Sequence, residues 1–499
     1  ECAAVVPLAD TTVALNTVPA WLRFLAVPVL LHIALCVGVF QYGLSSTEMQ
    51  RLHIAGPSRL IEPYLRALHV FGPLGVIRTY LRGEQDEKLY LEYSKLLLLG
   101  RADMKYIAER QNDPHMDLSV PARAWPYRDV RVEYPPLAFL ATLPPALITT
   151  DYRHYRYAFA GYMLALQLLN LWLATKLLRA PISAERVGPQ MQRTLYLSLG
   201  FLAALGLVVV TRMDHLVLTS TLLILWAFER AQRSDNKQRE RLAWAAACGA
   251  FTALGVMIKL VPGLAGFAAA VLWLSSGARD RWRCVGACLL AGAAVLLAAN
   301  LGMYALAGER YLQTFQYHSL RGVQIESLYA GLLMCLRPLG LSLRVEESFG
   351  STNLASVATP VIKPLSLALF AVVAGFICLR RRYSCDGRGA LLLTCALLLA
   401  FMLTNRVFSP QYLIWVGAAL CAWAAEESPN LRAFLLFLSA VWLSQLIFPR
   451  GYPVLKALHP LAAVVLNVRN VSLVVFSVWL IRRTSKARGR TRAFAPSIC

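Results

Sequence analysis

The acids between Glu84 and Glu133 are the first residues in this chain that could do chemistry, and Asp86 is the foremost of them. Tyr90 follows Asp86 by four residues, so a helix would place both side chains on one face. A carboxylate in such a place can take the proton from an attacking hydroxyl group. Asp86 lies on the path from an apolar segment to an apolar surface helix, which favours this chemical role.

A second group of acids and tyrosines precedes the paired prolines Pro135 and Pro136. A structural interpretation is open here, because acids and prolines at a helix start stabilise its first turn. The structural and the chemical interpretation therefore stand side by side for this group. Its members are Tyr127, Asp129, Glu133 and Tyr134.

A third group combines His318, Arg321 and Glu326. A guanidinium group can bind a phosphate through two hydrogen bonds, and a histidine adds a donor whose charge can be tuned. The group is therefore a candidate phosphate site. Taken alone, this segment favours the simpler interpretation of a loop joined by an Arg–Glu ion pair.

Cations at the ends of other apolar segments strengthen the phosphate interpretation. Arg469 falls inside the last apolar segment, where an unpaired charge is costly and usually functional. Each of the other cations, taken singly, could instead be an interfacial residue whose charge reaches toward water. Together they would form a ring of positive charge on the face that carries Asp86. They are Arg212, Lys259 and Arg406, with Gln411 just beyond Arg406.

The composition indicates that membrane helices position these groups. Of the 499 residues, 57% are apolar and 16% are charged, which excludes a disordered chain and an ordinary soluble enzyme. The net charge of +22 would suggest nucleic acid for a soluble protein. Most of that charge lies in short loops between apolar segments, so we expect membrane lipids and no nucleic acid as partners. The 11 cysteines do not suggest a disulfide framework.

We expect an all-α polytopic membrane protein with about 12 transmembrane helices, each needing about 20 residues to cross the bilayer. The first apolar segment is interpreted as a retained helix rather than a signal peptide. The segment 134–148 is short and rich in proline, so we expect it to lie at the membrane surface. The expected spans lie near 22–43, 156–178, 194–211, 215–229, 243–258, 261–276, 284–306, 363–379, 389–404, 411–425, 431–448 and 460–481.

The basic loops predict the orientation of these spans. Clusters of arginine and lysine fall on one side of the membrane if both chain ends are cytoplasmic. The whole chain, 1–499, is then a single membrane domain with a basic cytoplasmic tail at 482–499. The other side receives two large extracytoplasmic loops, at 44–155 and 308–362, and these hold most of the polar groups named above.

A carboxylate beside a ring of cations at a membrane surface suits sugar transfer from a lipid-linked sugar phosphate. Departure of the sugar makes the carrier phosphate more negative, and cations stabilise that charge. A carboxylate deprotonates the incoming hydroxyl group. Attack from the opposite face inverts the anomeric carbon, so no covalent intermediate is needed.

Several segments resemble the motifs of a known family of enzymes. They are similar to the GT-C class of membrane glycosyltransferases, and in particular to the bacterial polyprenol-phosphate-mannose-dependent mannosyltransferases of the GT87, or DUF2029, group. The similar segments run from Asp86 to Gly100, from Pro126 to Leu137, from His318 to Ser327 and from Asn405 to Tyr412, followed by Arg469-Asn470.

The resemblance implies a GT-C fold with an outer cavity, a polyprenyl-phosphate sugar as donor, often mannose, and inversion at the sugar. It implies that Asp86 is the base and that His318 contacts the donor phosphate. It also implies a bacterial inner (cell) membrane, with the site on the periplasmic or extracellular side. Residues 101–125 are additional to the family pattern, which leaves open whether Asp103 instead of Asp86 lies nearest the acceptor.

Two other functions were weighed. A transferase that uses soluble sugar nucleotides is disfavoured, because the chain has no Asp-X-Asp pair and no dinucleotide-binding fingerprint. We expect no metal and no cofactor, since protein cations can carry the charge. The alternative function is a transporter or flippase of lipid-linked sugars. Such proteins are typically built from repeated halves with sites at mid-membrane, and neither feature is found in this sequence.

Overall fold

The computed structural model describes residues 86–111, 123–178, 184–206, 208–234, 237–379 and 383–484. All of them belong to one compact unit of the chain. The expected first span at 22–43 and the basic tail beyond residue 484 lie outside the described residues.

Within the described ranges, six helices are long and apolar enough to cross a membrane. The expected count of about twelve spans is therefore not confirmed, although every expected span after the first coincides with helical structure. The six are α8 (Tyr152–Leu178), α14 (Arg281–Ala307), α17 (Thr359–Leu379), α18 (Gly387–Thr404), α20 (Ser428–Gln445) and α22 (Pro460–Thr484).

The remaining helices of the bundle are shorter or more polar. The expected span 194–211 is divided in two at Gly206, whose positive φ ends one helix before a single further turn. These helices are α9 (Ala184–Leu205), α10 (Val208–Thr211), α11 (Asp214–Arg233), α12 (Gln238–Val256), α13 (Gly263–Ser275) and α19 (Ile414–Ala424).

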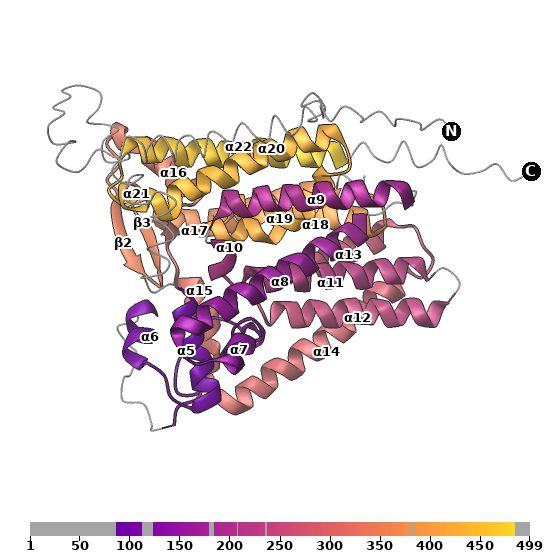
Figure 1. Cartoon of the computed structure of the whole chain (residues 1–499), viewed down its shortest axis with the longest axis horizontal. Helices are drawn as coiled ribbons and strands as arrows, with labels where there is room; N and C mark the ends of the chain where they lie inside the picture. The colour runs from indigo at the N-terminus through magenta and orange to yellow at the C-terminus, as the bar shows by residue number, and fades with distance from the viewer. Residues whose placement is uncertain are drawn as a thin grey trace, which may run out of the picture. The chain divides into compact units, whose positions relative to one another are not determined.

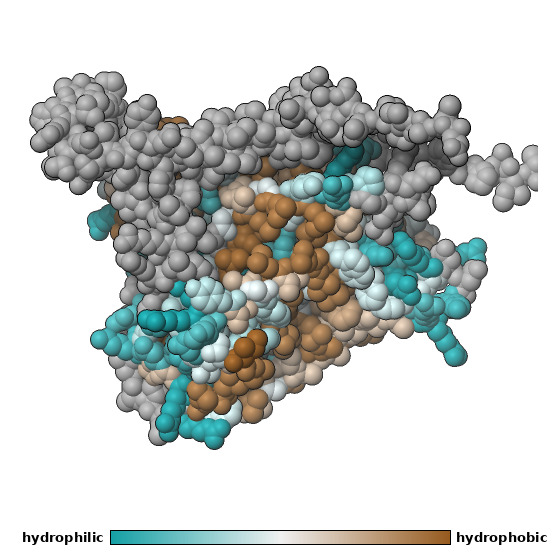
Figure 2. Space-filling view, viewed as in Figure 1, coloured by the Kyte–Doolittle hydropathy of each residue, from teal (hydrophilic) through white to brown (hydrophobic). Residues whose placement is uncertain are grey.

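The helices run side by side, and they differ in how much of their surface is covered (Figure 1). Helix α18 is central, because 89% of its apolar stretch is buried against neighbouring helices. The corresponding share is only 17% for α14 and for α17, so α14 exposes leucine side chains and α17 exposes leucine and valine side chains. Figure 2 shows such apolar side chains over the middle of the helices and hydrophilic ones toward their ends, as expected for a bilayer-spanning bundle.

The first polar segment forms short helices at one end of the bundle. These are α5 (Asp86–Leu99), α6 (Met104–Gln111), η2 (Pro136–Ala138) and α7 (Phe139–Ile148). Helix α5 ends at Gly100, which has a φ of +67° and leaves no room for a Cβ beside the Arg123 side chain. The segment expected at the membrane surface forms η2 and α7, which together cover only Pro136–Ile148 and are too short to span a bilayer.

The second polar segment contains helices and a small sheet that the all-helical prediction did not include. Its helices are α15 (Glu309–Leu320), α16 (Leu328–Leu336) and η3 (Arg337–Leu339). Its strands are β1 (Val323–Gln324), β2 (Arg344–Ser348) and β3 (Ser351–Ala355), antiparallel in the order β1-β3-β2. Three further short helices lie near the same end: η4 (Pro410–Leu413), η5 (Leu446–Arg450) and α21 (Tyr452–Lys456).

A two-residue turn explains why β2 and β3 pair. Phe349 and Gly350 both have positive φ, the conformation that suits the twist of a tight hairpin. The hydroxyl group of Tyr317 on α15 donates to the carbonyl oxygen of Phe349, which ties the turn to the helix. Strands β2 and β3 have only five residues each, too few for a clear alternation of polar and apolar residues, so the hairpin was not predicted from the sequence.

Candidate active site

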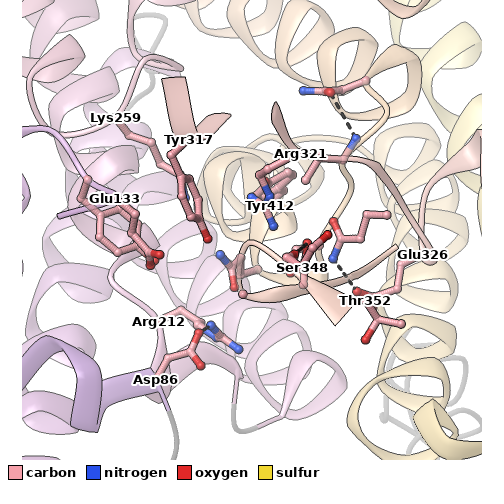
Figure 3. A pocket seen from close by; sticks show the side chains of 18 of the residues that line it. Asp86, Glu133, Arg212, Lys259, Tyr317, Arg321, Glu326, Ser348, Thr352 and Tyr412 are labelled. Carbon is pink, nitrogen blue, oxygen red and sulfur yellow. Dashed lines mark hydrogen bonds and ion pairs between the residues drawn. The ribbon is translucent and has the colours of Figure 1, made fainter. Parts of the chain in front are cut away.

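A cavity of about 1090 Å³ lies where the two polar segments meet. Side chains from α5, α6, α15, the β2–β3 hairpin and several helix ends line it. Asp86 and Arg212 lie on one side of it, while Ser348 and Thr352 lie on the other (Figure 3). Groups that are more than 200 residues apart in the sequence therefore face one space.

Asp86 is the first residue of α5, and its carboxylate lines the cavity. It forms ion pairs with two arginines, Arg212 from the turn between α10 and α11 and Arg110 from α6. The Arg212 side chain is 15% exposed, whereas that of Arg110 is 43% exposed. Burial lowers the pKa of Arg212 to about 10, so Arg212 remains a cation at neutral pH. One partner of Asp86 is thus fixed in the protein and the other is open to solvent.

A buried carboxylate holds Lys259 at the cavity wall. The ammonium group of Lys259 lies 2.7 Å from Oδ1 of Asp214, and the indole N–H of Trp415 donates to the same oxygen at 2.6 Å. Tyr412 stacks on Trp415 with 4.2 Å between ring centroids, and Lys259 lies over both rings. These contacts give a cation in a fixed position beside an aromatic surface.

Two guanidinium groups face the same part of the cavity. Arg406 donates to the carbonyl oxygen of Ser319 at 3.0 Å. Burial is the main cause that lowers the pKa of Arg406, and the nearby positive charge of Arg321 lowers it further. Like charges held together are costly unless an anion lies between them. Among the described residues, Nε of Arg321 is buried without a hydrogen-bond partner. This pair, together with the nearby carboxylate of Glu133, is a charged part of the candidate site.

Glu326 is a second, more deeply buried acid of the cavity. One of its carboxylate oxygens accepts a hydrogen bond from Gln324 at 2.9 Å. Burial raises the pKa of Glu326 to about 7, although the charges of Arg469 and Arg212 oppose the shift. Arg469 donates to the backbone oxygen of Glu326 at 2.5 Å and lies over the ring of Phe408, 4.2 Å from its centroid.

The cavity brings together most of the residues that the sequence predicted for a site. Asp86, Glu133, Tyr134, Lys259, Arg321, Glu326, Arg406 and Gln411 all line it. The backbone of His318 lies in α15, between Tyr317 and Arg321, both of which line the cavity; the side chain of His318 is outside the described set.

Four predicted residues lie behind the cavity or away from it. Tyr90 is 1% exposed and packs against Tyr134 and Phe159, so the helix spacing that put it with Asp86 does not bring it to the surface. The other three support the fold locally. Tyr127 donates to the backbone of Tyr134, Asp129 accepts from the backbone of Trp125, and Arg469 packs behind Glu326.

Asp86 and Asp103 differ in their position relative to the cavity. Asp86 lines the cavity, whereas Asp103 does not. Oδ1 of Asp103 accepts the backbone N–H of Tyr106 at 3.0 Å, which caps the start of α6. Asp103 therefore has a structural role that its residue type explains.

Sequence reasoning missed Arg110 as a site residue. Arg110 lies in the additional segment 101–125, where no motif pointed to it, and only the fold of α6 brings it to Asp86. Arg212 was recognised as a cation, but nothing in the sequence paired it with an acid 126 residues away. Tyr317, Glu347 and Lys456 also line the cavity without having been predicted.

No three His, Cys, Asp or Glu side chains in the described ranges group as metal ligands. Arginine and lysine side chains supply positive charge in the cavity.

A bundle of apolar helices with a polar, charged cavity at one end defines an integral membrane protein with a candidate site at that end. The sequence matches the model of glycosyltransferase family 87 over residues 133–410, which is more than half of the chain. The chain belongs to that family and is a glycosyltransferase, and this confirms the family expected from the motifs.

The structure also has a distant likeness to the crystal structure of ArnT from Cupriavidus metallidurans bound to undecaprenyl phosphate. The TM-score is 0.43 and the sequence identity 15%, covering 87% of this chain and 79% of that one. No curated protein matches the sequence.

Proposed function

We propose that this glycosyltransferase moves a hexosyl group, with mannose as the favoured sugar, from a polyprenyl-phosphate donor to a hydroxyl group of a lipid or glycan acceptor. The observation that carries the proposal is the meeting of Asp86 with the cations Arg212, Lys259, Arg321 and Arg406 in one cavity. Membership of family 87 supports glycosyl transfer as the chemistry.

The donor phosphate is assigned to Arg321 and Arg406, with His318 on the same segment and Lys259 nearby. These two guanidinium groups lie close enough to repel each other, and a phosphate between them would relieve that repulsion. A phosphodiester that becomes a monoester gains negative charge as the sugar leaves, so the cations stabilise the transition state more than the bound donor.

An apolar part of the cavity lies next to these cations and suits the first units of an isoprenoid chain. Leu260, Val261, Phe401, Val407 and Trp415 line it. A polyprenyl chain would pass from this surface toward the membrane, which the apolar helices α14 and α17 also face. The proposed donor therefore places its phosphate and its chain in adjacent parts of one cavity.

In the proposed reaction, the acceptor oxygen attacks the anomeric carbon of the donor. The bond between that carbon and the phosphate oxygen breaks, and its electron pair leaves with the polyprenyl phosphate. The proton of the acceptor hydroxyl passes to the carboxylate of Asp86. A single displacement inverts the anomeric centre, and Arg212 holds the carboxylate in place throughout.

A transfer assay on the purified, membrane-reconstituted protein tests this function. The donor is a polyprenyl-phosphate mannose, and the product is measured with wild type, Asp86→Asn and Asp103→Asn. We expect transfer by wild type and by Asp103→Asn, because Asp103 only caps α6. Loss of the base should reduce the rate by roughly 10²- to 10⁴-fold in Asp86→Asn.

The outcomes separate the competing assignments. If Asp86→Asn transfers the sugar as fast as wild type, Asp86 is not the base, while membership of family 87 is unaffected. If the wild-type protein moves the donor across the vesicle membrane but never consumes it, the result supports the transporter interpretation instead.

A further inference from the structure

A buried carboxylate behind the cavity contacts two of the side chains that line it. Asp214 is the first residue of α11, its side chain is 1% exposed, and it does not line the cavity. Its Oδ1 accepts hydrogen bonds from the ammonium group of Lys259 and from the indole N–H of Trp415, and both of these side chains line the cavity. Asp214 lies outside every sequence motif that resembles the family.

The contacts of Asp214 join three separate parts of the chain. Lys259 lies between α12 and α13, Trp415 belongs to α19, and Tyr412 of η4 stacks on Trp415. The ammonium group of Lys259 lies 5.1 Å from the ring centroid of Trp415 and 5.3 Å from that of Tyr412. We call these three residues the cation–aromatic face of the cavity. One carboxylate oxygen therefore fixes a face that three segments build.

Asp214 is itself held in place by the fold. An acid in the first turn of a helix is stabilised by the helix dipole. The imidazole of the next residue, His215, donates to the carbonyl oxygen of Val209 at 3.0 Å. The amide of Asn170 on α8 donates to the carbonyl oxygen of His215 at 3.0 Å. Because the start of α11 is anchored in this way, a side chain that binds Asp214 is fixed as well.

A fixed lysine binds an anion at a lower entropic cost than a free one. The flexible side chain of lysine carries about 2 kcal/mol of rotamer entropy, and order that exists before binding is not lost on binding. The ammonium group has three N–H donors, so the bond to Asp214 leaves others for a ligand. The hydrogen bond from the indole N–H likewise fixes how the ring of Trp415 is rotated.

We propose that Asp214 is a positioning residue for the donor, which orients Lys259 toward the donor phosphate and the Tyr412–Trp415 pair toward the first isoprene unit. This inference rests on the proposed function and adds the residue that sets the geometry of the donor site. Asp214 acts through these side chains and does not touch the donor.

Charge alone would give Asp214 the opposite effect on donor binding. Its negative charge offsets the positive charge of Lys259, so a carboxylate that only neutralised the lysine would weaken the attraction for a phosphate. Loss of the carboxylate charge would then strengthen donor binding, whereas loss of a positioning residue weakens it. The direction of the change therefore decides between the two roles.

Binding of farnesyl phosphate to the purified protein in lipid nanodiscs tests the role of Asp214. Titration calorimetry measures the Kd for wild type, Asp214→Asn and Trp415→Phe, which removes the indole N–H and keeps an aromatic ring. We expect Asp214→Asn to raise the Kd roughly tenfold, as for the loss of one charged hydrogen bond. Trp415→Phe should raise it roughly threefold, as for the loss of a neutral one.

A double-mutant cycle shows whether Asp214 acts through Lys259. In the Lys259→Met background, Asp214→Asn should raise the Kd only about threefold, which is the part that depends on Trp415. General damage to the fold would give the full effect in both backgrounds. Asp280→Asn is the matched control, because it breaks an ion pair of 2.8 Å with Arg241 that lies outside the cavity. It should bind farnesyl phosphate as wild type does.

The inference is overturned if Asp214→Asn binds farnesyl phosphate as tightly as wild type, or more tightly. It is also overturned if the variant loses the same factor with and without Lys259. If Asp214→Asn does not fold, an unchanged Kd for Trp415→Phe overturns it. A wild-type protein that does not bind farnesyl phosphate would instead contradict the proposed donor, and with it the proposed function.

Discussion

At the scale of single residues, the cavity separates charges that are held by the fold from charges that remain available to a ligand. Lys259 is held by the buried Asp214, and Arg212 is held by Asp86. Arg321 has a buried Nε without a partner among the described residues. Binding an anion would satisfy that group, so Arg321 is the residue at which donor binding is most directly tested.

Arg321→Ala should raise the KM for a polyprenyl-phosphate donor by roughly ten- to a hundredfold, because a charged hydrogen bond to phosphate contributes about 1.5–3 kcal/mol. His318→Ala should act in the same direction. The measurement is steady-state kinetics with varied donor. Arg310→Ala is the control, since Arg310 lies at the start of α15 and donates to backbone oxygens outside the cavity. Donor kinetics unchanged in both Arg321→Ala and His318→Ala would refute the phosphate site.

The buried carboxyl group of Glu326 should make stability depend on pH. Its pKa is raised from 4.5 to about 7, so the folded protein binds this proton more tightly than the unfolded chain. The associated stabilisation is fully present below pH 4.5 and is lost as the pH rises through about 7. A shift of this size corresponds to about 3 kcal/mol.

Glu326→Gln keeps the shape of the protonated acid and removes its titration. We expect the variant and wild type to unfold at similar temperatures at pH 5, and the variant to unfold at the higher temperature at pH 8. Thermal unfolding in detergent at both pH values measures this. If the unfolding temperatures of the variant and of wild type differ by the same amount at pH 5 and at pH 8, Glu326 does not make stability depend on pH.

At the scale of elements, helix packing decides where the short polar helices lie. Helix α5 is anchored beside α8 by an ion pair between Glu87 and Arg156, with 3.4 Å between the charged atoms. Both side chains are buried, and their pairing fixes the start of the helix from which Asp86 points. A buried partner left alone is costly, so this pair holds the orientation of α5 more than it adds net stability.

Helices α12 and α14 show how closely the elements pack. A Cβ added to Gly249 would overlap the backbone carbonyl group of Cys288, so Gly249→Ala must push the two helices apart. We expect a loss of about 1–3 kcal/mol in the free energy of unfolding, seen as a lower unfolding temperature.

Gly286→Ala on α14 is the matched control for this prediction. Nothing lies within 4 Å of a Cβ at Gly286, so alanine should leave stability unchanged or raise it by about 0.5–1 kcal/mol. Equal unfolding temperatures for the two variants would contradict the close approach of α12 and α14.

At the scale of the whole molecule, the basic loops and the cavity lie at opposite ends of the helices. The loops that join α11 to α12 and α13 to α14 carry arginine and lysine, whereas the cavity lies at the end formed by α5, α6 and α15 (Figure 1). The rule that basic loops face the cytoplasm then predicts that the cavity opens on the extracytoplasmic side.

Cysteine labelling of intact cells tests this orientation. Lys105 on α6 and Gln238 at the start of α12 are both exposed. A membrane-impermeant thiol reagent should label Lys105→Cys in intact cells above the level of the unsubstituted protein. It should label Gln238→Cys only after the membrane is opened. The reverse pattern would place the cavity on the cytoplasmic side.

Hydropathy and charge are properties of short stretches of chain, so the residues alone indicate the helical segments, the basic loops and the available acids and cations. Which of these residues meet depends on the tertiary structure. Arg212 reaches Asp86 and Lys259 reaches Asp214, whereas Arg469, predicted as a cation of the site, packs behind Glu326. Such partners depend on how each helix is rotated and which helices are neighbours, and those are set by the packing of the whole bundle.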